Sequence, residues 1–310
     1  MDTDSERTPE NTSSSRRTLL QLILFSAGES RLRAGWRLLL QVVLLILLVF
    51  GLEFILGYYL IPRSAVLQDN SFFLSQLILL ISVTFSVLFA RTVFDGRSFR
   101  SLGLTGKRAG VELGLGFLIG GSVMGLIFLI AWSLGWLRIQ GFAWEANSLG
   151  STALETGLFL IVFLAVSWQE ELLFRGYWLQ NLEEGLNLIW AVGITSLFFA
   201  VAHWGNPLFS LRPLAGLLLG SLLLSAGYLV TRRLWMPVGI HLGWNFLGGV
   251  VLGFPVGGLQ IPSLIKHSPV GPDWLMGGSF GPEGGLLLLP GLAVGFFMIW
   301  AYSVYADPGE

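Results

Sequence analysis

The chain of 310 residues contains no cysteine, and only 12% of its residues are charged. The absence of cysteine excludes disulfides, thiol nucleophiles, cysteine-ligated zinc and iron–sulfur clusters. The charged fraction is about half that of an ordinary soluble domain, whereas 54% of the residues are hydrophobic and the mean hydropathy is +0.72. These values exclude a water-soluble globule and predict a polytopic membrane protein.

Histidine and lysine are also scarce. The three histidines are His203, His241 and His267, and sixteen arginines stand beside only two lysines. The formal net charge is −1, and most of the cations flank apolar runs instead of forming a basic patch. The charge pattern therefore gives no reason to expect a nucleic-acid partner.

Apolar runs of about 20 residues, long enough to cross a hydrocarbon core ~30 Å thick, recur along the chain. They are too long and too uniformly apolar for the alternating strands of a membrane barrel, so each must satisfy its backbone as a helix. The predicted fold is all-α, a transmembrane bundle of about eight spans. The expected spans lie near 38–61, 72–90, 111–136, 153–174, 187–202, 213–230, 235–253 and 285–305.

The segments outside the spans differ in composition. Residues 1–17 are polar and rich in Ser and Thr, which predicts a disordered tail, and the short apolar run 18–25 predicts an interfacial helix. The segment 254–284 contains five prolines and many glycines, so we expect an irregular loop on the external face.

The distribution of cations predicts the orientation. Thirteen Lys and Arg residues precede the first span or lie in the second and sixth loops, against four on the opposite side, with Arg175 left out because it lies in a span. The positive-inside rule then places both termini in the cytoplasm. An even number of spans agrees with this, because it requires both termini to lie on the same side. We expect the protein to lie in a bacterial plasma membrane.

Ionisable residues within apolar helices are informative because a charge at membrane depth is costly unless it is compensated. Glu53, Glu112 and Glu155 are isolated. A carboxylate near the headgroups, or one hydrogen-bonded to a neighbouring helix, explains each of them.

The remaining polar residues concentrate on three predicted helices. The fourth span ends in E-E-L-L-F-R (Glu170 to Arg175), the fifth ends at His203, and the seventh carries His241 and Asn245 one turn apart. By the charge count, the fourth and fifth spans end at opposite faces. Glu170 and His203 can therefore meet only within the membrane thickness or through irregular spans.

The chemistry of these residue types favours peptide hydrolysis. Glu171 has Arg175 at i+4, which suits an ion pair, whereas Glu170 points about 100° away and needs another partner. A carboxylate between helices is suited to take a proton from water. An imidazole and a carboxamide on one helical face are suited to stabilise an oxyanion. Taken singly, each of these residues is equally well explained by interhelical hydrogen bonding.

These residues resemble the motifs of the CAAX protease and bacteriocin-processing family (CPBP or Abi) of intramembrane proteases, which includes the Ras-converting CAAX prenyl endopeptidases. E-E-x-x-x-R matches Glu170, Glu171 and Arg175, F-x-x-x-H matches Phe199 and His203, and H-x-x-x-N matches His241 and Asn245. The matched region runs from about 150 to 255. R-S-L-G-L at 100–104 is also similar to a stretch of bacterial members.

The resemblance implies a role for each matched residue. Glu170 would be the general base, aided by His203, and His241 with Asn245 would form the oxyanion site. Phe199, Glu171 and Arg175 would give structural support. The resemblance also implies a division of the chain into a tail (1–35), N-terminal transmembrane helices (36–149), a protease core (150–255) and an external loop with the last helix (256–310).

Several alternatives stay open at this stage. The family has been described as metal-dependent, and zinc at Glu170, His203 and His241 is the alternative to a site that needs no cofactor. We favour the metal-free form because asparagine is a poor zinc ligand and no H-E-x-x-H motif occurs. A non-catalytic scaffold or immunity protein of the same fold, or a proton-coupled transporter, would use the same polar residues differently.

Partners follow from the same resemblance. We expect contact with membrane lipid and a protein or peptide substrate that has a membrane-associated segment.

Overall fold

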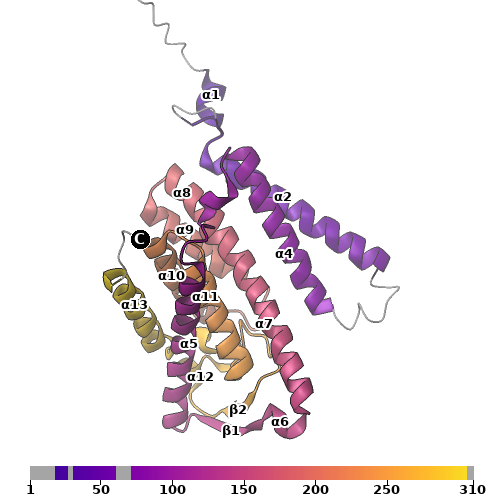
Figure 1. The fold of residues 1–310 in the computed structure, drawn as a ribbon, viewed down its shortest axis with the longest axis vertical. Helices are drawn as coiled ribbons and strands as arrows, with labels where there is room; N and C mark the ends of the chain where they lie inside the picture. Colours follow the sequence, from indigo (N-terminus) through magenta and orange to yellow (C-terminus); the bar gives the residue numbers. More distant parts are fainter. Residues whose placement is uncertain (1–17, 27–30, 61–70, 306–310) are drawn as a thin grey trace, which may run out of the picture.

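The computed structural model describes residues 18–26, 31–60 and 71–305, which form a bundle of helices with one small sheet (Figure 1). The predicted tail at 1–17 lies outside the described residues. The main helices are α2 (Ala34–Ile55), α4 (Ser71–Phe89), α5 (Ala109–Ser133), α7 (Leu149–Glu171), α9 (Leu188–Ala202), α10 (Leu211–Thr231), α11 (Trp235–Asn245) and α13 (Leu288–Tyr305). Each predicted span corresponds to one of these helices.

Six helices of the described chain are long and apolar enough to cross a membrane: Ala34–Tyr58, Ser71–Phe94, Ala109–Ser133, Leu149–Gly185, Leu211–Thr231 and Leu288–Tyr305. The other two predicted spans are shorter. Helix α9 has 15 residues, about 22 Å at the rise of an α-helix, and α11 continues only through a π-helical turn, Phe246–Val251. The all-α membrane bundle is therefore confirmed, and α9 is too short to cross the ~30 Å core.

The fourth span was expected to end near residue 174, and this boundary is wrong. Helix α7 continues through a π-helical segment, Leu172–Leu179, into α8 (Gln180–Gly185), giving an unbroken helix of 37 residues. The apolar run stops at Arg175, and Gln180 and Asn181 add further polar residues, but the helix itself continues. Glu170 and Glu171 consequently lie in the interior of a long helix, not at its end.

Two prolines begin helices instead of interrupting them. Pro213 and Pro237 are each the third residue of their helices, α10 and α11, where a missing backbone N–H costs no helical hydrogen bond. They therefore give no support to the broken helices that a transporter reading would favour.

Helices α5 and α11 pack against each other through two pairs of glycines with the spacing G-x-x-x-G, Gly116 with Gly120 and Gly239 with Gly243. A Cβ atom at Gly116 would lie 2.2 Å from the carbonyl oxygen of Met236, and one at Gly243 would lie 2.2 Å from that of Phe117. Such close backbone contact is typical of small residues at membrane helix interfaces. It fixes α11, which carries two of the predicted site residues, against the centre of the bundle.

The segment 254–284 was expected to be irregular, and this expectation holds only in part. Strand β2 (Ile265–Pro269) pairs antiparallel with β1 (Leu137–Phe142), which follows α5, with a bulge between Ile139 and Gly141. A short helix, α12 (Asp273–Met276), and 3₁₀ turns follow. The prolines and glycines conceal these elements in the sequence because they dominate its composition.

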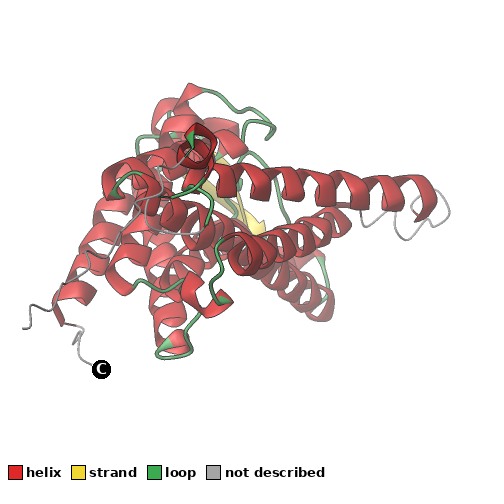
Figure 2. Ribbon diagram, turned by 90° about the horizontal axis from the view of Figure 1, so that it is seen from above, coloured by secondary structure: helices red, strands yellow, loops and turns green. Residues whose placement is uncertain are grey.

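The N-terminal part of the described chain is the least embedded. Helix α1 (Leu19–Leu24) is capped by Thr18 and Gln21, in agreement with the short helix expected at 18–25. Helix α2 contacts α4 at one end and projects away from the bundle at the other (Figures 1 and 2). Only 6% of its most apolar stretch is buried. This leaves most of α2 available to lipid.

Candidate active site

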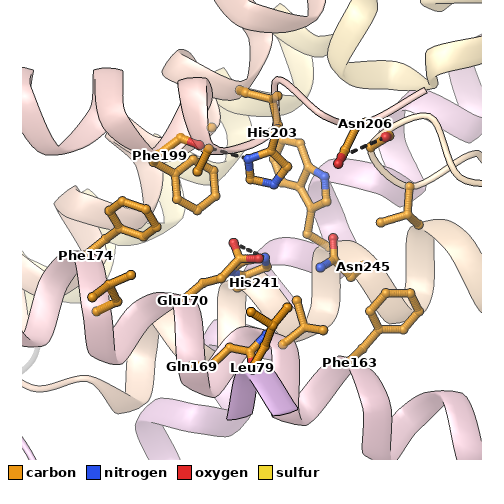
Figure 3. A pocket seen from close by; sticks show the side chains of 18 of the residues that line it. Leu79, Phe163, Gln169, Glu170, Phe174, Phe199, His203, Asn206, His241 and Asn245 are labelled. Carbon is orange, nitrogen blue, oxygen red and sulfur yellow. Dashed lines mark hydrogen bonds and ion pairs between the residues drawn. The ribbon is translucent and has the colours of Figure 1, made fainter. Parts of the chain in front are cut away.

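The predicted site residues line one cavity between the helices. Its volume is about 400 Å³, and Figure 3 shows Glu170, His203, His241 and Asn245 pointing toward the same space. These side chains come from α7, the end of α9, and α11, so the three motif-bearing segments converge. The cavity lies partway along the 37-residue helix, within the depth of the bundle, which meets the condition that allows Glu170 and His203 to meet.

Glu171 and Arg175 form a buried ion pair, as their spacing predicts. Glu171 Oε1 accepts hydrogen bonds from Arg175 Nη1 at 3.0 Å and from His241 Nδ1 at 2.9 Å, and both members of the pair are fully buried. Arg175 Nη2 donates to the backbone carbonyl of Ser221 on α10 at 2.8 Å, and its guanidinium lies 4.8 Å from the ring centroid of Phe199. The pair therefore links α7, α9, α10 and α11 around the cavity. The pair lies beside a π-helical segment, and such segments are frequent at functional sites.

Glu170 has a different environment from its neighbour. Its side chain is 23% exposed, and its Oε2 lies 3.9 Å from Nε2 of His241, beyond hydrogen-bond distance. Within the described chain, Glu170 Oε2 has no hydrogen-bond partner. Of the two adjacent glutamates, Glu170 is thus the one whose carboxylate faces the cavity, with the His241 imidazole at 3.9 Å and no arginine of the described chain paired to it.

The two histidines of the cavity have defined tautomers when neutral. His203 Nδ1 lies 2.8 Å from the backbone carbonyl of Phe199, and His241 Nδ1 lies 2.9 Å from the Glu171 carboxylate. A carbonyl and a carboxylate only accept hydrogen bonds, so Nδ1–H must be the donor in both rings. Each neutral imidazole therefore keeps its Nε2 lone pair for another group, and Nε2 becomes a donor only in the imidazolium form.

Asn245 follows His241 by one helical turn and is also buried, with 7% of its surface exposed. No side chain among the described residues hydrogen-bonds its carboxamide. Since it lines the cavity, its two N–H groups can donate to a molecule bound there.

The three isolated glutamates either bond to a neighbouring part of the bundle, as expected, or lie outside the site. Glu112 is buried and paired with Arg233, which joins the start of α5 to the segment before α11. Glu53 is exposed on α2, and Glu155 is half-buried near the start of α7. None of the three lines the cavity.

Sequence reasoning missed several polar or aromatic residues of the cavity wall, among them Gln169, Asn206, Trp244 and Glu283. Glu283 is the most unexpected because it comes from the Gly- and Pro-rich segment, in the sequence G-P-E-G. It is 5% exposed, and burial raises the pKa of its carboxyl above the ordinary value. A lone acid between a proline and a glycine in a loop is ordinarily a solvated residue, so the sequence alone gave little signal.

Zinc at Glu170, His203 and His241 is the alternative that the sequence leaves open. Among the residues that the structure describes, no three His, Asp or Glu side chains are grouped so that they could hold a metal ion. The side chains of Glu170, His203 and His241 line one cavity without forming a ligand set, and we derive no reaction step through a metal.

Comparison with known proteins gives one result. Residues 152–247 match the family model described as type II CAAX prenyl endopeptidase Rce1-like. The matched segment runs from the start of α7 into the turn after α11 and contains all the motif residues, which confirms the resemblance noted in the sequence. No curated protein and no solved structure matches the chain. The family and the apolar helices together indicate an integral membrane protein with a peptidase domain.

Proposed function

We propose, on the basis that residues 152–247 belong to the Rce1-like CAAX endopeptidase family, that the chain is an intramembrane endopeptidase using a glutamate-activated water. One observation carries the proposal: Glu170, His203, His241 and Asn245, from three separate helices, face a single cavity. Side chains that only join helices through hydrogen bonds need not face a shared cavity, whereas the residues of a reaction centre must.

In the first step, Glu170 takes a proton from water. A water that donates one hydrogen bond to each of two acceptors holds them about 4–5 Å apart, given ordinary hydrogen-bond lengths. The 3.9 Å between Glu170 Oε2 and the Nε2 of neutral His241 is close to this value. His203 lines the same cavity, and its Nε2 lone pair can accept the second water hydrogen in place of His241 and so orient the water. The water oxygen then attacks the scissile carbonyl carbon.

The second step needs donors for the oxyanion that forms. The Asn245 carboxamide donates in any protonation state. The proton that Glu170 took from water passes to Nε2 of His241, and the resulting imidazolium, which Glu170 and Glu171 both stabilise, donates to the oxyanion. When the intermediate collapses, the C–N bond breaks, His241 gives this proton to the leaving amine nitrogen, and the acyl part leaves as a carboxylic acid. Glu171 and Arg175 take no proton and hold His241 in place.

The substrate class follows from the wall of the cavity. Beyond the polar residues, side chains of α2 and α4, Leu45, Phe72, Leu79 and Val83, line its apolar part. The apolar part of the cavity thus extends toward α2 and α4, which suits a peptide with a lipid chain or membrane-associated segment. We propose CAAX-type or related substrates on this basis and no nucleic-acid partner.

Orientation and host are part of the proposal. The Arg-rich segments meet at one end of the bundle, where Arg37 pairs with Asp95 and Arg232 with Glu183. We infer that this end faces the cytoplasm of a bacterial plasma membrane. Because the chain has no cysteine, single cysteines at Lys107 and Lys266 can be labelled from either side of sealed vesicles to check it.

The experiment that tests the function uses purified protein in proteoliposomes and an internally quenched CAAX peptide with a farnesylated cysteine. We expect cleavage after the prenylated cysteine by the wild type. Proton or solute flux across the same vesicles without any peptide cleavage would contradict the proposal and favour a transporter.

A further inference from the structure

Glu283 belongs to the wall of the proposed reaction centre although it lies far along the chain from the motifs. It occupies a 3₁₀ turn, Pro282–Gly284, between the external segment and α13. Its buried side chain lines the same cavity as Glu170 and Asn245. The roles assigned above leave this carboxyl unused.

The backbone around Glu283 is fixed by close packing. A Cβ atom at Gly216 of α10 would lie 1.8 Å from the carbonyl oxygen of Glu283, so only glycine allows the turn and the helix to approach this closely. Gly281 has φ = 105°, a conformation that residues with a side chain rarely adopt. The turn therefore holds the Glu283 carboxyl in one place.

The carboxyl bonds to the helix that carries two site residues. Trp244 Nε1 donates to Glu283 Oε1 at 2.9 Å, and Trp244 lies between His241 and Asn245 on α11. Since no described side chain hydrogen-bonds the Asn245 carboxamide, the position of that group depends on the turn of helix that bears it. One hydrogen bond thus connects the external segment to the proposed oxyanion donor.

We propose that the Trp244–Glu283 hydrogen bond is a latch, and that Glu283 is a positioning residue for Asn245 and His241. This inference rests on the proposed function. A misplacement of about 1 Å at a reaction centre costs on the order of 10²-fold in rate, so a latch that fixes one turn of α11 affects kcat. The raised pKa of Glu283 favours its neutral form, so glutamine at this position imitates it.

The test compares variants of both partners in the farnesylated-peptide assay. Glu283→Leu and Trp244→Phe should each lower kcat by about 10- to 100-fold, with KM changed by less than about twofold. The double variant should be no worse than the singles, because both remove the same bond. Glu283→Gln, which keeps the acceptor, should retain kcat within about threefold.

A matched control has the same kind of bond outside the cavity. Trp178 Nε1 donates to the buried Gln41 Oε1 at 3.0 Å, and neither residue lines the cavity. Gln41→Leu and Trp178→Phe should lower the melting temperature without changing kcat.

A second measurement does not depend on cleavage. Amide hydrogen exchange over 241–251 should rise in Glu283→Leu and Trp244→Phe and stay unchanged in Glu283→Gln. Unchanged exchange in both bond-breaking variants overturns the latch, as does wild-type kcat in either of them or a loss in Glu283→Gln equal to that in Glu283→Leu. A wild type that does not cleave, with exchange behaving as expected, contradicts the proposed function and supports the latch.

Discussion

Two clusters of buried polar residues in this bundle differ in how completely they are paired. Asp95 accepts four hydrogen bonds, from Arg37 and Arg91 at 2.9 Å each, from the Tyr177 hydroxyl at 3.3 Å and from Asn181 at 3.4 Å. None of these five residues lines the cavity. The Asp95 cluster joins α2, the end of α4 and the continuation of α7.

The cavity cluster contrasts with it. Glu170 Oε2 has no hydrogen-bond partner within the described residues, and the Asn245 carboxamide faces the cavity. A buried acceptor without a donor is costly unless a bound molecule satisfies it. On the proposed function, the fully bonded Asp95 carboxylate stabilises the fold, whereas the Glu170 carboxylate is left available for a reaction.

The largest expected effect comes from the unpaired carboxylate. Glu170→Gln keeps the shape of the side chain but cannot take a proton at neutral pH, so kcat should fall by at least about 10³-fold. Because Glu170 Oε2 makes no hydrogen bond within the described residues and lies 3.9 Å from His241, the melting temperature should change by less than a few degrees. Steady-state kinetics and thermal melting on the same preparation check both parts. Retained activity in the folded variant would refute the role of Glu170 as base.

The next effect concerns the oxyanion donor. Asn245→Ala should lower kcat by on the order of 10²–10³-fold with little change in KM. Asn245→Asp is the companion variant, since a protonated carboxyl can still donate. If Asn245 only joined helices, the loss would instead be about 0.6 kcal/mol of stability with nearly intact turnover.

The paired cluster should respond in the opposite way. Asp95→Asn leaves the buried cations Arg37 and Arg91 without a full counter-charge, which should cost about 3–5 kcal/mol of stability. Turnover per folded molecule should stay within about twofold of the wild type. Chemical or thermal unfolding, combined with active-fraction kinetics, measures the two separately. A large kcat defect at full folding would erase the distinction between the clusters.

The smallest expected effect is that of metal removal. With no described group of three His, Asp or Glu side chains able to hold a metal ion, dialysis against a strong chelator should leave cleavage unchanged. Purified protein should contain no stoichiometric zinc by elemental analysis. Activity lost on chelation and restored by zinc alone would move Glu170, His203 and His241 to ligand roles.

Much of this arrangement was predictable from local patterns. Hydropathy located the eight main helices of the described chain, and the i,i+4 spacing of Glu171 and Arg175 predicted their ion pair. The spacing of His241 and Asn245 placed them on one face. These features depend only on neighbours within a few residues along the chain.

What escaped prediction depends on contacts between distant segments. Hydropathy predicts that the fourth span ends near residue 174, but the helix continues. Its continuation carries Asn181, which hydrogen-bonds to Asp95, and hydropathy contains no information about a bond between residues 86 positions apart. The pairing of β1 with β2 joins segments on either side of the motif region. The G-x-x-x-G pairs at 116–120 and 239–243 were a readable signal for helix contact, but neither identifies its partner.

Glu283 illustrates the same limit within the site. Its place in the cavity depends on the close contact of its turn with Gly216 and on the hydrogen bond from Trp244. Neither partner is near it in sequence, and the surrounding glycines and proline suggest an exposed loop.

The proposed function makes Glu170 the general base of peptide hydrolysis in the membrane. The most direct experiment on this role is proteomics of membrane fractions from cells that lack the protein and are supplied with the wild type, Glu170→Gln or Asp95→Asn at equal folded amounts. New protein termini are expected with the wild type and Asp95→Asn, and none with Glu170→Gln. The same termini in the Glu170→Gln cells would contradict the role of Glu170.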